Sequence, residues 1–193
     1  FGLMPGYWQS GKVFPAMKRA ADLGFKAVML ADRLIEIEAS QAGIYMASMA
    51  NTIERSGQPF EPPCALFSSG ELVVTVGKEK GIGGRNQEFA LAAALKIGGS
   101  ENIVMASVDT DGTDGPGFQF SHGTTGIPCL AGGIVDGKTT EEAKERGVDI
   151  IGALRHHDTT HALWKLQSGV VACLNISVID LTVARILGGS EVK

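Results

Sequence analysis

A glycine-led segment, Gly81-Ile-Gly-Gly-Arg-Asn-Gln-Glu88, carries the first residues whose types suit chemistry. Glycines just before a helix leave backbone N–H groups at the positive end of the helix dipole, where phosphate or carboxylate binds well. Arg85 adds a forked cation that grips a pair of anionic oxygens. The segment is not a P-loop, because no Gly-Lys-Ser/Thr follows, and its glycine spacing does not fit a dinucleotide fingerprint. An ordinary helix start with a surface arginine is the alternative. The candidate ligand-binding residues from this local chemistry are Gly83 and Gly84, with Arg85 as a candidate catalytic residue.

An acidic loop, Asp109-Thr-Asp-Gly-Thr-Asp-Gly115, follows a predicted strand. In open α/β sheets, ligands bind beyond the carboxyl ends of the strands. Three carboxylates separated by small residues can hold Mg²⁺ or accept a hydroxyl proton. An EF-hand is excluded, because its sixth and twelfth positions are Asp114 and Phe120 instead of Gly and Glu. A solvated Asp/Gly turn is the alternative. The candidate metal ligands are Asp109, Asp111 and Asp114, with Asp111 also a candidate catalytic residue and Thr110 and Gly112 candidate ligand contacts.

Two further segments carry weaker signals. Ser68-Ser-Gly-Glu71 is a predicted tight turn between two strands, which either meets a ligand or is a plain hairpin; its candidate ligand contacts are Ser69, Gly70 and Glu71. The second segment is His156-His-Asp-Thr159, just before a predicted helix, where Asp158 or Thr159 makes a good N-cap. Its two adjacent histidines fit a cap and a surface residue better than a metal site, because no other histidine lies at ligand spacing.

Composition narrows the class of protein. Hydrophobic residues make up 44% and charged residues 20% of the 193 residues, which fits a globular protein and excludes a disordered chain. The net charge is −4 and no run of Lys and Arg is present, so neither a nucleic-acid nor a membrane partner is expected. No apolar stretch is long enough to span a bilayer, and no signal peptide is recognisable. Three scattered cysteines fit reduced thiols in the cytoplasm better than disulfides.

Alternating helix and strand patterns must position the candidate residues. Apolar residues at helical spacing predict helices over residues 12–23, 35–53, 86–97, 139–146 and 158–166, the fourth with a Thr139/Glu142 capping box. Short β-type runs predict strands over 25–30, 65–67, 72–76, 103–108, 132–135 and 170–173, with a turn at 31–34 and a last strand or helix over 181–186. This alternation predicts an α/β fold with a mixed or parallel sheet flanked by helices.

A segment with three prolines, residues 56–63, is the best domain boundary in the sequence. The residues before it lack enough strands for a sheet of their own. We therefore expect residues 1–62 to be the remnant of a first domain and residues 63–193 to form an α/β domain. The chain opens with Phe1 instead of methionine, which also fits a fragment.

Taken in order, these segments resemble the C-terminal domain of class II glycerate 2-kinases, the MOFRL family. The resemblance covers about residues 64–187, while residues 12–60 are similar to the end of the family's Rossmann-like first domain. The matching residues are Gly83 to Glu88, then Thr110, Asp111, Gly112, Asp114 and Gly115, then Gly132, Val135, Asp136 and Gly137.

The resemblance implies transfer of the γ-phosphoryl group of ATP to the 2-hydroxyl of glycerate, with Mg²⁺, in a cleft between two domains. It implies that Arg85 stabilises charge on the glycerate or on the transferring phosphate, and that Glu71, Asn86, Gln87 and Asp111 line the same cleft. A lysine expected from the first domain has no counterpart here. The chain alone is therefore expected to be inactive, with glycerate, the nucleotide and the missing N-terminal domain as its partners and a homo-oligomer left open.

The chain also departs from the family pattern. Asn-Asn-Asp-Ser is replaced by His156-His-Asp-Thr159, which keeps Asp158 as a candidate contact. The closing anion loop, a Gly- and Thr-rich Thr-Asn-Val-Asn-Asp-Leu in the family, here reads Cys173-Leu-Asn-Ile-Ser-Val-Ile-Asp180, in which Asn175 and Ser177 remain as candidate contacts. Two alternatives therefore stay open. One is a non-catalytic binding protein of the same fold. The other is an oxidoreductase related to hydroxypyruvate reductases, for which no nicotinamide fingerprint is present.

Overall fold

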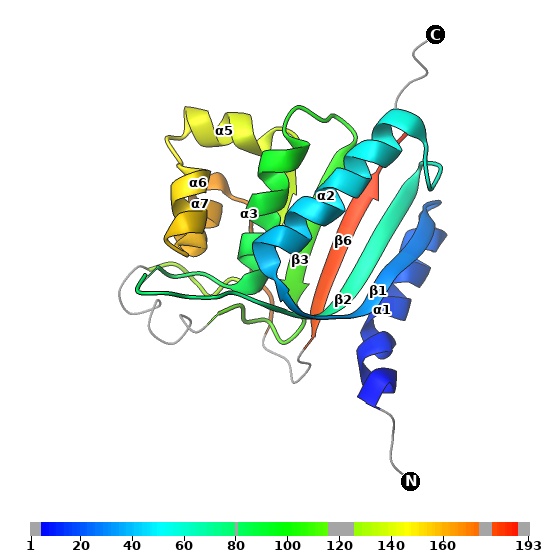
Figure 1. Cartoon of the computed structure of the whole chain (residues 1–193), viewed down its shortest axis with the longest axis horizontal. Helices are drawn as coiled ribbons and strands as arrows, with labels where there is room; N and C mark the ends of the chain where they lie inside the picture. Colours follow the sequence, from blue (N-terminus) through cyan, green and yellow to red (C-terminus); the bar gives the residue numbers. More distant parts are fainter. Residues whose placement is uncertain (1–4, 80, 116–125, 174–178, 189–193) are drawn as a thin grey trace.

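A mixed six-stranded sheet runs through the computed structural model of the chain, which describes residues 5–79, 81–115, 126–173 and 179–188 (Figure 1). The strands are β1 (Lys26–Glu38), β2 (Cys64–Val73), β3 (Ile103–Asp109), β4 (Gly132–Asp136), β5 (Gly169–Val170) and β6 (Asp180–Ile186). Their order is β1-β2-β6-β3-β4-β5, with β1 and β2 parallel and the other pairs antiparallel. The predicted α/β class with a mixed sheet is confirmed.

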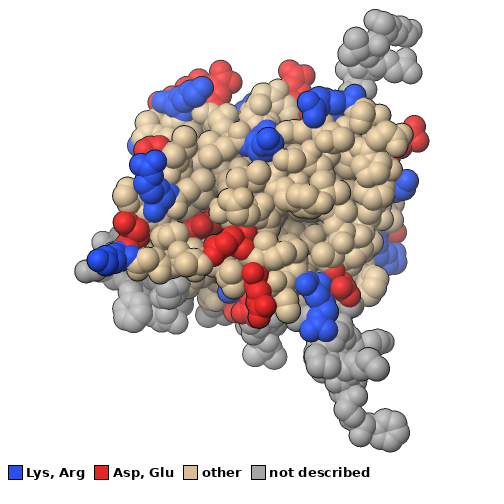
Figure 2. All heavy atoms as spheres, in the orientation of Figure 1, with Lys and Arg blue, Asp and Glu red and all other residues tan. Residues whose placement is uncertain are grey.

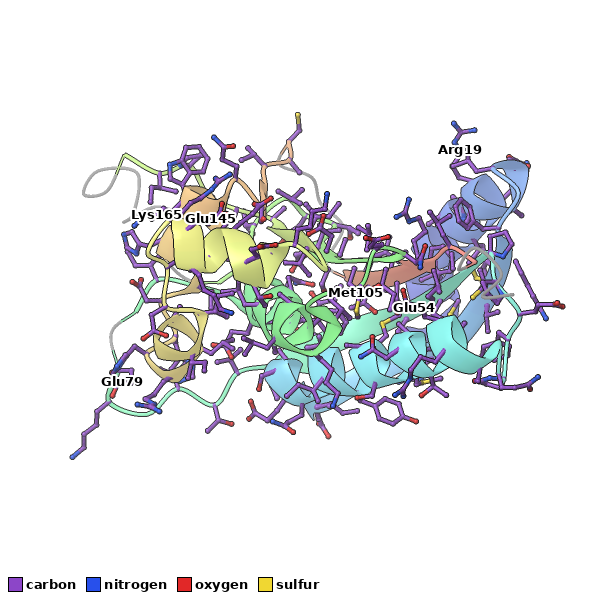
Figure 3. The ribbon with its side chains drawn as sticks, turned by 90° about the horizontal axis from the view of Figure 1, so that it is seen from above. Arg19, Glu54, Glu79, Met105, Glu145 and Lys165 are labelled. Carbon is purple, nitrogen blue, oxygen red and sulfur yellow. The ribbon has the colours of Figure 1, made fainter. Side chains whose placement is uncertain are left out.

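Helices cover both faces of this sheet. The main core lies beneath α2 (Ala39–Ser56) and α3 (Arg85–Ile97), whose alanines, together with Gly43 of α2, let the two helices approach closely. At their contact, a Cβ on Gly43 would overlap the carbonyl oxygen of Phe89. The opposite face is covered in part by α1 (Pro5–Asp22) (Figure 3). Val13 of this helix packs against Ala65 and Phe67 of β2.

Three short helices gather beside α3, on the side away from α2 (Figure 1). They are α5 (Thr139–Glu145), α6 (Ile150–Arg155) and α7 (Thr159–Leu166). Two of them were expected, but α6 was not, because its six residues are too few to show a helical period. Leu163 and Leu166 of α7 are buried against the main core, so this group stabilises the outer flank of α3.

The first strand is longer than the sequence indicates. The turn predicted at residues 31–34 is wrong, because β1 continues to Glu38 and pairs with β2 through three register shifts. The predicted helix start at Ile35 is wrong as well, since α2 begins at Ala39. Ile35 and Ile37, which the predicted helix over 35–53 included, lie on the strand instead and are 39% and 40% exposed. A backbone φ of 61° at Glu36 marks one of the irregularities.

The turn predicted at Ser68-Ser-Gly-Glu71 is wrong, because these residues lie inside the continuous strand β2. Gly70 pairs with Leu34 of β1 on one side and with Asp180 of β6 on the other. Its φ of 151° and the close Leu34 backbone leave no room for a side chain. The Ser-Gly sequence typical of a turn therefore lies in the middle strand of three paired strands, where a side chain would clash with β1.

The Thr139/Glu142 capping box is also not formed. Lys138 is the N-cap of α5, and the Oδ1 of Asp136 instead accepts hydrogen bonds from the backbone N–H groups of Lys138 and Thr139. The predicted strand over residues 170–173 is reduced to the two-residue strand β5. Residues 181–186, for which a strand and a helix were both expected as possibilities, form part of the strand β6.

The proline-rich segment connects α2 to β2, and the residues before it contribute α1, β1 and α2 to the same sheet and core. The division into residues 1–62 and 63–193, and the Rossmann-like origin of the first part, stay predictions. In the described part of the chain, no helix has the length and apolar character needed to cross a membrane.

Candidate functional site

Arg85 is the first residue of α3 and lies between two buried aspartates. Its Nε donates to both carboxylate oxygens of Asp180, at 2.9 and 2.8 Å, and its Nη2 donates to Oδ2 of Asp109 at 2.7 Å. The Asp180 and Asp109 side chains are 1% and 3% exposed, whereas that of Arg85 is 21% exposed. Burial lowers the pKa of Arg85, but the hydrogen bond and charge of Asp180, with Asp109 and Asp114, raise it overall. Arg85 therefore stays a cation.

Asp180 joins three elements of the fold at this point. Besides Arg85, its carboxylate accepts from the backbone N–H of Leu72 at 2.8 Å and from Nδ2 of Asn86 at 2.6 Å. It sits at the start of β6, opposite Gly70 of β2 and Asp109 of β3. Sequence reasoning did not select Asp180. The available signal was its position as the last polar residue of the closing loop, directly before the predicted strand or helix over 181–186.

Asp114 caps the N-terminus of α3 from a distant loop. Its Oδ1 accepts from the backbone N–H of Asn86 at 3.1 Å, and its Oδ2 accepts from that of Gln87 at 2.9 Å. The Nδ2 of Asn86 also donates to Oδ1 of Asp114, and the Oδ1 of Asn86 accepts from the hydroxyl of Ser107. These two N–H groups of the helix start, expected to be open to a ligand, are thus occupied by a protein carboxylate.

The glycines around Arg85 allow the segments of the site to pack backbone against backbone. A Cβ on Gly83 would overlap the Thr159 hydroxyl, and one on Gly84 would overlap Asp114. Gly115, with φ of 89°, lies against the carbonyl oxygen of Gly83. Gln87 completes this packing, because its Oε1 accepts from the Thr160 hydroxyl at 2.7 Å.

The three candidate metal ligands point to different partners. Asp109 uses Oδ2 for Arg85 and Oδ1 for the backbone N–H of Asp111, at 3.1 Å, while Asp114 holds the helix start. The Oδ1 of Asp111 accepts from the backbone and the hydroxyl of Thr113, and its Oδ2 has no hydrogen bond within the described ranges. Over those same ranges, no group of three or more His, Cys, Asp and Glu side chains is arranged to hold a metal ion. Asp109, Asp111 and Asp114 therefore do not fit a shared three-carboxylate site.

Burial governs the titration of the two most enclosed candidates. It raises the pKa of Asp109 to about 6, although the hydrogen bond from Asp111 and the charge of Arg85 lower it in part. Burial likewise raises the pKa of Asp114 to about 6, against the hydrogen bonds from Asn86 and Gln87. Both carboxyl groups thus titrate within reach of neutral pH.

A pocket of about 520 Å³ opens beside Arg85. Its polar and glycine lining includes Glu71, Gly83, Gly84, Arg85, Glu88 and His157. In this pocket His157 is hydrogen-bonded to Glu88, with Nδ1 and Oε1 separated by 2.6 Å. Figure 2 shows acidic side chains gathered toward the end of the molecule where α2 and α3 begin (compare Figure 1). Arg85 is the only Lys or Arg among the described residues that line this pocket.

Ser69, Thr110, Gly112 and Asp158 do not line this pocket. Ser69 donates to the carbonyl oxygen of Asp32 at 3.0 Å, and the Thr110 hydroxyl donates to that of Ile179 at 3.0 Å. Asp158 lines a different pocket, where it accepts from the backbone of Ile82 and pairs with His161. Gly112 has φ of 91° within the acidic loop. Asn175 and Ser177 lie outside the described residues.

Comparison with known proteins places these features in one family. The MOFRL family matches residues 64–176. A glycerate 2-kinase of Pyrococcus horikoshii is 42% identical over 149 residues, which is 77% of this chain and 31% of that protein. A protein of Agrobacterium vitis that carries the name of a hydroxypyruvate reductase is 32% identical over 157 residues, 81% of this chain and 33% of that one.

A solved structure has the same fold. The crystal structure of a glycerate kinase from Thermotoga maritima superimposes with a TM-score of 0.79 at 36% identity, covering 89% of this chain and 39% of that one. The chain thus spans about a third of the length of the relatives it matches.

Proposed function

Because the chain belongs to the MOFRL family, we propose that it forms part of an ATP-dependent glycerate 2-kinase that phosphorylates the 2-hydroxyl of glycerate. The likeness to a glycerate 2-kinase at 42% identity supports this reaction. The expected fragment state is part of the same proposal, since the chain covers only about a third of the length of these relatives. We expect the rest of the site, including a lysine, to come from a first domain outside these 193 residues.

The position of Arg85 is the observation that carries the proposal. Phosphoryl transfer depends chiefly on positioning and on neutralising the negative charge of the transferring group. Arg85 has its Nε and one side of Nη2 fixed by Asp180 and Asp109, and its Nη1 makes no hydrogen bond within the described part of the chain. The free edge of a fixed guanidinium at a pocket wall suits an anionic oxygen pair of glycerate or of the γ-phosphate.

Nucleotide and metal binding also belong to this proposal. Mg²⁺ commonly uses one or two carboxylates together with the substrate phosphates. Asp111 is the acidic-loop carboxylate that fits this use, since one of its oxygens is outside the hydrogen bonds above. Mg²⁺ would supply charge neutralisation on the phosphates. We place the enzyme in the cytoplasm, because Cys64, Cys129 and Cys173 are free thiols.

Substitution of Arg85 tests the proposal in the complete polypeptide that contains this chain. Arg85→Lys keeps the positive charge but cannot bridge Asp109, Asp180 and an anion at once. We expect kcat/KM for glycerate to fall by at least about tenfold, equivalent to about 1.4 kcal/mol of transition-state stabilisation. Arg55→Lys on the exposed side of α2 is the matched control. Normal kcat/KM in Arg85→Lys would refute the role given to Arg85.

Two other functions are separated by direct assays. The Agrobacterium vitis relative favours testing hydroxypyruvate reduction, and NADH oxidation with hydroxypyruvate would support that activity over the kinase. The altered closing loop favours testing a non-catalytic binding role. Calorimetry showing that the complete polypeptide binds glycerate or Mg·ATP without turnover would support that role. Formation of phosphoglycerate excludes it.

A further inference from the structure

A second pocket, of about 510 Å³, opens between β1 and α2 and shares no lining residue with the pocket beside Arg85. We call it the α2–β1 pocket. None of the described residues that line it is Asp, Glu, Lys, Arg or His. Figure 2 shows an area without charged side chains over the middle of α2 (compare Figure 1). The largest apolar side chains of the lining come from three elements and include Leu30, Leu34, Met46, Met49 and Phe89.

The packing of α2 explains why this space is left open. Gly43 brings α2 so close to α3 that a Cβ on it would overlap the carbonyl oxygen of Phe89. On the other side of the pocket, the register of β1 against β2 shifts both before and after Ala31, which bends the strand locally. The lining there is formed by the small side chains of Ala31 and Ala42. The helix therefore lies against α3 and leaves room toward β1.

Ser68 places an unpaired hydroxyl group in this apolar pocket. The residue is 4% exposed, and its Oγ makes no hydrogen bond to any residue that the structure describes. Successive residues of a strand face opposite sides of the sheet, so Ser68 shares the side of Leu66, which belongs to the main core. The neighbouring Ser69 instead donates to the carbonyl oxygen of Asp32. A buried hydroxyl without a partner is unfavourable, and a bound molecule that pairs with it would remove that cost.

The lining also indicates the class of molecule that fits. A charged ligand is disfavoured, because a buried charge needs a partner and no charged side chain lines the pocket. The flexible thioethers of Met46 and Met49 adapt to irregular shapes and make favourable contacts with aromatic rings. Ile37 and Tyr45 also line the pocket and are 40% and 69% exposed, so apolar surface continues to its mouth.

We propose that the α2–β1 pocket binds a small neutral molecule with an aromatic or other apolar body and one hydroxyl, carbonyl or N–H group that pairs with Ser68. Its volume is that of a small-molecule site, and an enclosed polar group among apolar side chains is the usual composition of such sites. An apolar side chain from another part of the polypeptide would fill the space but leave the Ser68 hydroxyl unpaired. The site does not depend on the proposed kinase function.

Two probes that differ by one hydroxyl group, 2-naphthol and naphthalene, test the role of Ser68. Calorimetric titration of the complete polypeptide is expected to show 2-naphthol binding about fivefold more tightly than naphthalene, which is the effect of an added hydrogen bond. Ser68→Ala is expected to remove this difference. Ser48→Ala is the matched control and should keep it, because the Ser48 hydroxyl on α2 bonds to the carbonyl of Ile44 and does not line the pocket.

Filling the pocket provides an independent measurement. Ala42→Leu and Ala31→Leu each add side-chain volume to the lining, and each is expected to prevent detectable binding of both probes. The two substitutions lie on different elements, α2 and β1, so the test stands if one of them does not fold. Thermal unfolding checks that each variant is folded.

The outcomes are decisive in both directions. No binding of 2-naphthol, or an unchanged preference for it in Ser68→Ala, would overturn the proposal. Undiminished binding in a folded filling variant would also overturn it, since the probes would then bind elsewhere. Binding to the 193-residue chain but not to the complete polypeptide would overturn it in favour of a segment of the first domain that occupies the pocket. The kinase assignment is tested separately, by formation of phosphoglycerate.

Discussion

Three buried carboxylates surround one arginine at the start of α3. Asp109 and Asp180 contact the Arg85 guanidinium directly, and Asp114 contributes at longer range. Two carboxylates on one cation leave a net negative charge in a poorly hydrated place, which is costly unless one of them binds a proton. Burial, together with the charge of Asp180, therefore raises the pKa of Asp109 to about 6.

Stability should therefore depend on pH through Asp109. Its folded-state pKa of about 6 lies above the ordinary 3.8, so between these values the folded protein keeps a proton that the unfolded chain has released. The free energy of unfolding then falls as pH rises from about 4 to about 6, by up to about 3 kcal/mol for this group. Urea unfolding at pH 4.5 and 6.5 measures the change.

Asp109→Asn should reduce the fall in the free energy of unfolding between about pH 4 and about pH 6. The rest of that fall is expected from Asp114, whose pKa is raised in the same direction. Asp22→Asn on α1 is the control, because the Asp22 side chain is 49% exposed in a surface ion pair with Lys18. Equal pH slopes for the wild type and Asp109→Asn would contradict the assignment.

The sequence alone identifies Arg85 and Asp109 as a cation and a carboxylate suited to ligands, but not as partners of each other. Their pairing with Asp180 depends on contacts 24 and 95 residues apart in the chain. Local spacing carries no information on such contacts, because they form only when β6 lies between β2 and β3. The sequence therefore predicted which residues have suitable chemistry, but it did not predict their hydrogen-bond partners.

At the scale of elements, the site is held by loops in backbone contact. Gly115 and Gly57 both have positive φ, 89° and 64°, but only Gly115 lies where a Cβ would overlap another backbone, that of Gly83. Gly57→Ala should cost about 1 kcal/mol for its backbone conformation alone. Gly115→Ala should cost about 1 to 3 kcal/mol more, because the two loops must separate. Chemical denaturation of both variants gives the comparison, and equal losses would argue against tight loop packing.

Helices and strands with a strong period were predictable, and those that depend on neighbours were not. The run of alanines in α3 and the alternation in β3 were recognised within one or two residues. In β2, a local Ser-Gly signal typical of a turn is overridden by pairing with strands on both sides. In β1, the irregular register disrupts the strict alternation that identifies a strand.

At the scale of the whole molecule, residues on both sides of the proline-rich segment share one core. Residues 63–193 alone would lose β1, which pairs with β2, and α2, which covers Phe89 and the rest of α3. We expect this shortened chain to bind a hydrophobic dye and to unfold at a lower urea concentration than the 193-residue chain, or without a cooperative transition. An unchanged unfolding midpoint would show instead that residues 63–193 are an autonomous folding unit.

The position of β6 has a consequence for synthesis. It comes after every other strand among the described residues, yet it lies between β2 and β3. During translation the facing edges of β2 and β3 therefore stay unpaired until β6 has been synthesised, and such edges invite pairing between nascent chains. A premature stop before residue 180 would remove the middle of the sheet and the carboxylate that holds Arg85, and so would abolish both fold and site.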